Sequence, residues 1–144
     1  MTLGMMEFGW WSLLGILLGG LANFFLGALW YMKLFSKSWL EATGRTSEEF
    51  KDGSPGAGLV LTFGGCVATT AVVALVYGWA GGETLLDGLV VGLILGAGVA
   101  AMEGMKAAVY NFDERVKPWA LYAVNGSYAV CGLALAGVVY ALIT

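Results

Sequence analysis

Four long apolar segments, separated by short polar stretches, dominate the chain. They cover residues 8–32, 57–80, 85–109 and 119–143, and each exceeds the roughly 20 helical residues that cross the hydrocarbon core of a bilayer. None shows the strict alternation of apolar and polar residues that is typical of a half-buried strand. The pattern therefore predicts an all-α fold, with four transmembrane helices arranged as two helical hairpins in a single membrane domain over residues 1–144.

Composition favours lipid rather than water as the solvent. Hydrophobic residues make up 59% of the 144 residues and charged residues only 12%, whereas soluble domains carry about 25% charged residues. The first apolar segment is not typical of a signal peptide, because no Lys or Arg precedes Phe8 and the apolar run is too long for an h-region. We therefore expect a retained first helix.

The basic residues are distributed unevenly over the connections. They lie in the loop 33–56, in the connection after the third segment, and one lies just before that connection: Lys33, Lys37, Arg45, Lys51, Lys106, Arg115 and Lys117. The second connection and the sequence before Phe8 carry no Lys or Arg. Because cytoplasmic loops carry the excess of Lys and Arg, we expect the loop 33–56 in the cytoplasm, with the N-terminus and C-terminus outside.

The exit of the first segment, GALWYMKLFSKSWLEATG, mixes aromatic and basic residues. Aromatic rings and lysines concentrate at the headgroup level of membranes, so this stretch predicts a short interfacial helix ending at Gly44, with Phe35 and Trp39 sharing a face on a continued helix. The expected interfacial anchors are Trp30, Tyr31, Phe35, Lys37 and Trp39.

Several short signals predict helix boundaries. Thr46 with Glu49, and Thr84 with Asp87, have the spacing of capping pairs. Ser54-Pro55 and Pro118 are typical of helix starts.

Glycines inside the segments predict close helix packing, because small residues let backbones approach in lipid. The expected packing positions are Gly15, Gly19, Gly88, Gly92 and Gly96. At 100° per residue, the last three share one stripe with Val99, Glu103, Lys106 and Tyr110, and we expect this stripe to face protein. Packing within the chain is favoured over packing against a second copy, and both remain open.

Polar residues within or near the segments are the candidates for function: Glu103, Lys106, Asn23, Asn111, Asn125 and Tyr128. Glu103 lies about 28 Å along its helix, near the inner edge of the ~30 Å core, so an interfacial ion pair with Lys106 is favoured over a transport or proton-relay role. The amides of Asn23 and Asn125 need partners, and hydrogen bonds between helices are favoured over ligand contacts. We expect Cys66 and Cys131 to be buried as small hydrophobic residues.

Enzymatic signatures are absent from the sequence. The chain has no histidine, which excludes a histidine base or a Ser-His-Asp triad, and two isolated cysteines do not predict a zinc site. We expect no enzymatic activity, no catalytic, cofactor-binding or metal-binding residues and no nucleic-acid partner, while a bound lipid between helices remains open.

Two functions remain. The first is a structural or accessory membrane subunit that acts through helix–helix contacts, either with itself as a homo-oligomer or in a larger membrane complex. The alternative is a small homo-oligomeric channel or transporter for an ion or small solute, using Glu103, Lys106, Asn23 and Asn125. The first is favoured because the charges are peripheral and no segment has a polar stripe along its full length.

The sequence resembles a bacterial membrane family, domain of unknown function 1761. The similarity rests on a G-x-L-W-Y element at Gly27–Tyr31, the Leu-Phe-x-Lys-x-Trp element at Leu34–Trp39 followed by Gly44, and a fourth segment with Asn125, Tyr128 and Gly132. Ser36 departs from the usual glycine, and Met32-Lys33 from a more turn-like pair. The resemblance implies an integral membrane protein and supplies no established activity, cofactor or catalytic residue. We expect the protein in the bacterial inner membrane.

Overall fold

A computed structural model describes residues 9–51 and 55–144 of the chain, and these residues are all-helical. The elements are α1 (Trp10–Leu29), η1 (Trp30–Leu34), α2 (Ser36–Thr43), α3 (Pro55–Trp79), α4 (Leu85–Leu95), η2 (Gly96–Ala101), α5 (Met102–Val109) and α6 (Pro118–Ile143). Because η1 extends α1, and α4, η2 and α5 are continuous, they form four long apolar helices at Trp10–Leu34, Gly56–Trp79, Leu85–Val109 and Pro118–Ile143. The prediction of four long apolar helices is confirmed.

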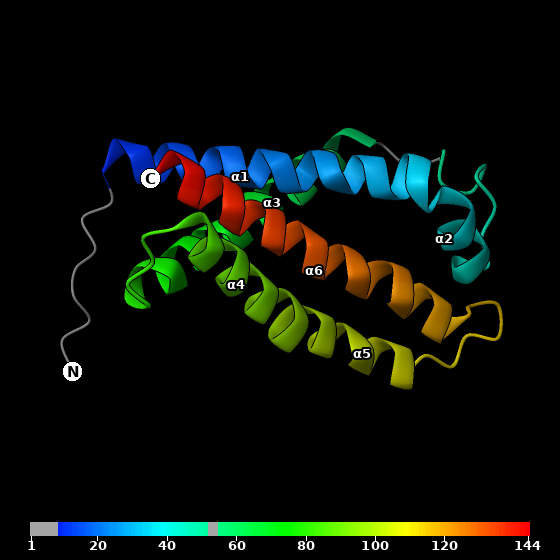
Figure 1. The fold of residues 1–144 in the computed structure, drawn as a ribbon. Helices are drawn as coiled ribbons and strands as arrows, with labels where there is room; N and C mark the ends of the chain where they lie inside the picture. The colour runs from blue at the N-terminus through cyan, green and yellow to red at the C-terminus, as the bar shows by residue number, and fades with distance from the viewer. Residues whose placement is uncertain (1–8, 52–54) are drawn as a thin grey trace.

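Helix α6 occupies the centre of the bundle and contacts α1, α2, α3, α4 and α5 (Figure 1). Helix α3 lies against α1 and α6 and makes fewer contacts with α4. Helix α2 and the connection between α5 and α6 lie at one end of the bundle (Figure 1). The turn between α3 and α4 lies at the other end, with the C-terminus beside the start of α1. Neighbouring long helices therefore run up and down, as expected for two hairpins.

Glycines bring α4 and α1 close to α6. A Cβ atom at Gly88 would overlap the carbonyl oxygen of Gly137, and one at Gly92 would overlap that of Leu133. On α1, a Cβ at Gly15 would lie 2.9 Å from the ring of Tyr140. Gly19 and Gly96 are equally buried and close to their neighbours. The five glycines expected to pack thus lie at helix contacts within one chain.

Local capping follows the sequence signals at three places. Thr84 and Asp87 form a reciprocal capping box, in which Asp87 Oδ2 accepts from the Thr84 N–H at 2.9 Å. Pro118 is the first residue of α6, and Gly44 ends α2 with φ of 66°. Glu49 accepts from the Thr46 N–H at 2.8 Å, but residues 47–51 form turns rather than a helix. Ser54 lies outside the described residues.

The expectation of a single stripe along the third span is wrong. Gly88, Gly92 and Gly96 are buried against α6, but Glu103 and Lys106 are exposed, as are Val99 and Tyr110. The reason is the π-helical segment η2, whose wider i→i+5 turn contains one more residue than an α-turn. The residues that face α6 are therefore Gly96, Ala101 and Ala108, and the two alanines are buried. Every residue after η2 lies one position later than a regular α-helix would place it on this face.

The first span also ends in a π-helical segment, η1, and does not continue into α2. Phe35 adopts φ of −123° and ψ of 18° between the two helices, and its carbonyl accepts from the Trp39 N–H at 2.8 Å. The two rings therefore have different neighbours: Phe35 lies 4.7 Å from Trp30 and Trp39 lies 5.6 Å from Tyr31, measured between ring centroids. The predicted short helix after the first span is confirmed as α2, which ends at Gly44, but Phe35 is its N-cap residue, so Phe35 and Trp39 do not share a face of one continued helix.

Candidate functional site

A small polar cluster lies inside the bundle, where α1, α3 and α6 meet. Asn23 is only 4% exposed. The Tyr128 hydroxyl donates to the Asn23 side-chain oxygen at 3.0 Å and is 3.1 Å from the Asn23 carbonyl oxygen. The Cys66 thiol lies 3.9 Å from the same hydroxyl. The amide therefore has the interhelical partner that its burial requires.

Two glycines make room for this cluster. The Asn23 side-chain oxygen lies against Gly132, and a Cβ at Gly27 would lie 2.8 Å from the Tyr128 hydroxyl oxygen. Any larger residue at either position would displace the hydrogen-bonded groups. Cys66 is buried here, as expected, but Cys131 is exposed on α6, so the expectation of burial is wrong for Cys131.

A second polar contact connects η1, which extends α1, to α6 closer to the basic end of the bundle. The Tyr31 hydroxyl donates to the Asn125 side-chain oxygen at 2.9 Å, and the Trp30 indole N–H donates to the Val124 carbonyl at 3.1 Å. The Tyr31 ring also meets the Tyr128 ring edge-on, with centroids 5.3 Å apart. Trp30 and Tyr31, which the sequence predicts as interfacial anchors, lie in η1 and hold the end of the first span against α6.

A cleft of about 210 Å³ opens between α5 and α6 near the same end. One wall is formed by the small residues Ala100, Gly104 and Ala107, and the other by Tyr122, Asn125 and Gly126. Asn111 also lines it. The cleft thus combines an apolar wall with two side-chain amides.

Charged groups gather outside the bundle core. Lys106 donates to both carboxylate oxygens of Glu103, at 2.7 and 2.9 Å, and each side chain is 66% exposed. Lys37 is exposed on α2. The Glu103–Lys106 pair is therefore an exposed ion pair on the outer side of α5.

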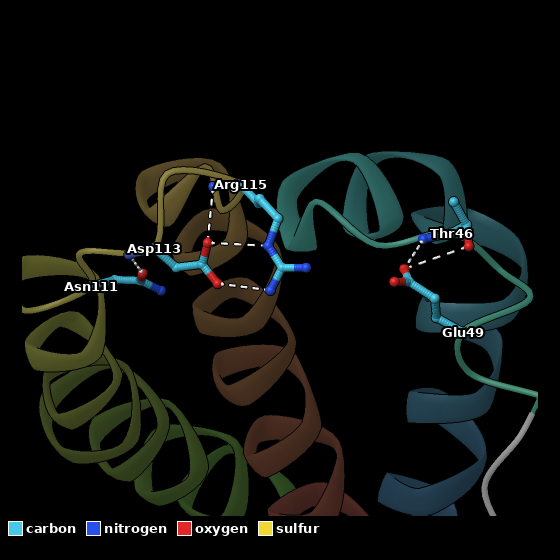
Figure 2. A network of polar contacts seen from close by, with 5 residues as sticks. All are labelled: Thr46, Glu49, Asn111, Asp113 and Arg115. Carbon is cyan, nitrogen blue, oxygen red and sulfur yellow. Dashed lines mark hydrogen bonds and ion pairs between the residues drawn. The ribbon is translucent and has the colours of Figure 1, made fainter.

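The two loops at the basic end carry separate polar turns (Figure 2). Asp113 accepts from the Arg115 side chain at 3.2 and 3.3 Å, and Asn111 accepts from the Asp113 N–H at 3.0 Å. The hydrogen bond from Arg115 lowers the pKa of the Asp113 carboxyl below its usual value. The loops also meet directly, because the Lys117 N–H donates to the Ala42 carbonyl at 2.8 Å.

These groups provide packing and hydrogen bonding rather than an evident reaction centre. Within residues 9–51 and 55–144, every buried side-chain nitrogen or oxygen has a hydrogen-bond partner, and no group of three or more Cys, Asp or Glu residues could hold a metal ion. The structure brings Asn23 and Tyr128 together, and places Asn111 and Asn125 around one cleft, whereas Glu103 and Lys106 contact only each other among these candidates.

Sequence reasoning missed the role of Cys66 beside Tyr128, the Trp30 contact with Val124, and the cleft itself. Tyr128 lies deep in the fourth apolar segment, and this position favours its hydroxyl as a hydrogen-bond partner of Asn23. The cleft had no comparable signal, because it depends on the residue displacement that η2 introduces.

A family model described as Protein of unknown function (DUF1761) matches residues 14–141, which confirms the resemblance seen in the sequence. The comparisons with curated proteins and with solved structures gave no match.

Proposed function

The chain belongs to the family described as Protein of unknown function (DUF1761), and we propose that this multi-pass membrane protein is a non-enzymatic structural or accessory subunit that acts through helix–helix contacts. The contact that we assign to this role is an association between two copies of the chain along α3.

The outward face of α3 carries the proposal. Gly58, Thr62, Gly65 and Thr69 follow one another at steps of four, three and four residues, which places them on one helix face, and all four are exposed. A Cβ added at Gly58 or Gly65 would meet no atom within 4 Å. In contrast, the glycines of α1 and of α4 lie against neighbouring helices. A glycine face without a neighbour in the chain fits a partner outside it.

The face is also suited to close approach. The Thr62 hydroxyl donates to the Gly58 carbonyl at 2.8 Å, and the Thr69 hydroxyl donates to the Cys66 carbonyl at 3.0 Å. Both threonine hydroxyl hydrogens are therefore already bonded within α3, and this helix face presents small side chains without an unsatisfied hydrogen-bond donor. Small residues at such spacing drive helix pairing in lipid by van der Waals contact, and a face that meets its own copy across a two-fold axis is self-complementary.

Transport through the chain has weaker support. Asn23 is hydrogen-bonded to Tyr128 inside the bundle, and Glu103 pairs with Lys106 on the outside of α5. These groups do not share a surface that could form one polar path. The contacts of Asn23 and Glu103 thus favour the structural role over the channel or transporter.

The test compares two neighbouring glycine variants of α3. Gly65→Leu fills the proposed face, whereas Gly64→Leu adds the same side chain about 100° away on the helix, also at a position with no atom within 4 Å. Stoichiometry is measured in liposomes by single-molecule photobleaching over a range of protein-to-lipid ratios. We expect dimers for the wild type and for Gly64→Leu, and at least tenfold weaker association for Gly65→Leu.

Three results would overturn the proposal. The first is a wild-type protein that stays monomeric at all ratios, and the second is equal association of the two variants. The third is flux of an ion or small solute into liposomes that Glu103→Gln abolishes, which would establish the channel or transporter instead. Under our proposal Glu103→Gln leaves association nearly unchanged.

We further propose that the protein resides in the bacterial inner membrane, with both termini outside and the basic loops in the cytoplasm. The support is that the two loops containing Arg45, Lys51, Arg115 and Lys117 lie at one end of the bundle, and cytoplasmic loops carry the excess of basic residues.

A further inference from the structure

We propose that the cleft between α5 and α6 binds one phospholipid from the adjoining leaflet, with the glycerol-ester region and the upper part of one acyl chain inside the cleft. This site is independent of the α3 face, and its occupant is a lipid rather than a second copy of the chain.

The size and direction of the cleft fit an acyl chain. The lining runs along α6 from Pro118 to Gly126, which is about 12 Å at 1.5 Å per residue. Helices that span a bilayer tilt by about 20° from its normal, so a lipid chain can lie nearly parallel to the cleft. Since a methylene group is about as large as a water molecule, which occupies about 30 Å³ in the liquid, a cleft of about 210 Å³ holds a segment of roughly seven carbons.

The wall chemistry fits the same ligand. Ala100, Gly104 and Ala107 offer an apolar surface with little side-chain volume, on which a chain can lie in van der Waals contact. The Tyr122 ring forms part of the facing wall. These apolar walls would not hold a water molecule well, because an ordered water in a cavity needs two to four polar partners.

The two amides select for a ligand that accepts hydrogen bonds. The Asn125 side-chain oxygen already accepts from Tyr31, and the Asn111 side-chain oxygen accepts from the Asp113 N–H. Among the described residues, neither side-chain N–H₂ group has an acceptor within hydrogen-bond distance. Ester carbonyls of a phospholipid only accept, so they match these donors.

A cation for the phosphate is available next to the cleft lining in the sequence. Lys117 directly precedes Pro118, which lines the cleft, and no carboxylate of the described residues forms an ion pair with Lys117. Lys106 and Arg115, in contrast, are paired with Glu103 and Asp113. The neighbouring Trp119 is 57% exposed, as is usual for a ring at the headgroup level.

The experiment counts bound phosphatidylglycerol by native mass spectrometry of the full chain, released from a mild detergent at defined lipid concentrations. Gly104→Leu fills the cleft; its backbone tolerates a side chain, because the nearest atoms to an added Cβ belong to Tyr122 at 4.0 Å. Gly98→Leu is the matched control on the same span, since a Cβ there meets no atom within 4 Å and Gly98 is not part of the cleft lining.

We expect one phosphatidylglycerol on the wild type and on Gly98→Leu, and at least fivefold lower occupancy on Gly104→Leu. Lys117→Gln should lower the occupancy several-fold while the apolar wall stays intact. Equal occupancy of Gly104→Leu and Gly98→Leu would overturn the proposal, and so would loss of the bound mass together with a monomer-to-dimer change, which would identify a second copy as the occupant.

A measurement on the wild type covers the case in which Gly104→Leu does not fold. Phosphatidylglycerol with a diazirine near the ester end of one chain is cross-linked in nanodiscs, and the labelled peptides are identified by mass spectrometry. Labels within residues 100–126 support the site, and labels confined to α3 or α1 contradict it. Because Gly65→Leu tests α3 separately, failure of one proposal leaves the other intact.

Discussion

Asn23 is the polar side chain whose burial makes the greatest demand on its neighbours. An amide without a partner in an apolar medium costs several kcal/mol, about 4–8 on the water-to-hydrocarbon scale, and Asn23 is 4% exposed. The Tyr128 hydroxyl lowers this cost by donating to the Asn23 side-chain oxygen at 3.0 Å. The pair therefore fixes the position of α1 relative to α6, since a slide of either helix would separate the two groups.

Tyr128→Phe tests this contact. We expect a loss of about 1–2 kcal/mol in the free energy of unfolding, because the buried Asn23 oxygen loses its donor, whereas helix pairs in lipid that lose a hydrogen bond usually lose about 0.6 kcal/mol. The measurement is reversible unfolding in mixed micelles. Tyr110→Phe is the control, since Tyr110 is 72% exposed.

A double-variant cycle sharpens the result. Once Asn23→Leu has removed the amide, Tyr128→Phe should cost less than it does alone, because the side-chain partner is gone and only the backbone carbonyl of residue 23 remains near the hydroxyl. Equal costs in both backgrounds would contradict a direct contact between the two side chains.

At the scale of one element, η2 contains a single additional residue. It lets Gly88, Gly92 and Gly96 face α6 while Glu103 and Lys106 remain outside. An uninterrupted α-helix of the same sequence would turn those two charged groups toward α6, where burying charges costs several kcal/mol per ion, even after relaxation. The π-turn therefore lets the glycines of the first half of the span pack against α6 while the charged residues of the second half stay exposed.

Deletion of Gly98 is expected to be tolerated. Without it the turn becomes α-helical, and Gly104 and Ala108 still face α6, so the thermal midpoint measured by size-exclusion chromatography should change by no more than a few degrees. Deletion of Val91, within the regular helix α4, is the control and should be severe, because it rotates Gly88 by about 100° away from Gly137. Equal damage from both deletions would mean that η2 has a role beyond this displacement.

The end of α2 gives a second prediction at this scale. Gly44 and Gly81 both have positive φ, 66° and 69°, so alanine at either site costs about 1–2 kcal/mol of backbone strain. A Cβ at Gly44 would also overlap the Arg115 carbonyl oxygen, whereas one at Gly81 meets no atom within 4 Å. Gly44→Ala should therefore lower the free energy of unfolding clearly more than Gly81→Ala, and similar losses would contradict the tight contact between the loops.

The same elements show what sequence can and cannot predict. Glycine spacing located Gly88 and Gly92 because a regular helix repeats its faces, and Thr84 with Asp87 located a helix start because capping is local. The exposure of Glu103 depends on η2, which forms in the context of α6 and has no local signal. The contact of Tyr31 with Asn125 could be predicted only if the first span and α6 were known to be neighbours. Predicting the cleft requires both the presence of η2 and the arrangement of the helices around α6.

At the scale of the whole molecule, the two basic loops meet at one end, where the Lys117 N–H donates to the Ala42 carbonyl. The orientation of the protein is therefore a single choice between two opposite arrangements, because both loops must lie on the same side. The distribution of basic residues favours the cytoplasm for this end.

Cysteine labelling of intact cells tests the orientation. In a background with Cys66 and Cys131 replaced by alanine, a cysteine at Gly82 should react with a membrane-impermeant maleimide, and one at Arg45 should react only after lysis. The reverse pattern would place the termini in the cytoplasm. Reaction at both sites in intact cells would indicate a mixture of orientations.

The central position of α6 has a consequence for biogenesis. Helices α1 and α4 are held mainly by α6, which is the last of the four spans to leave the ribosome. Until it inserts, the described parts of the earlier spans are joined mainly by the contacts of α3 with α1 and α4, and Asn23 lacks the Tyr128 hydroxyl as a hydrogen-bond partner. The nascent protein therefore passes through a stage with three unfinished spans, and its core closes only after α6 has entered the membrane.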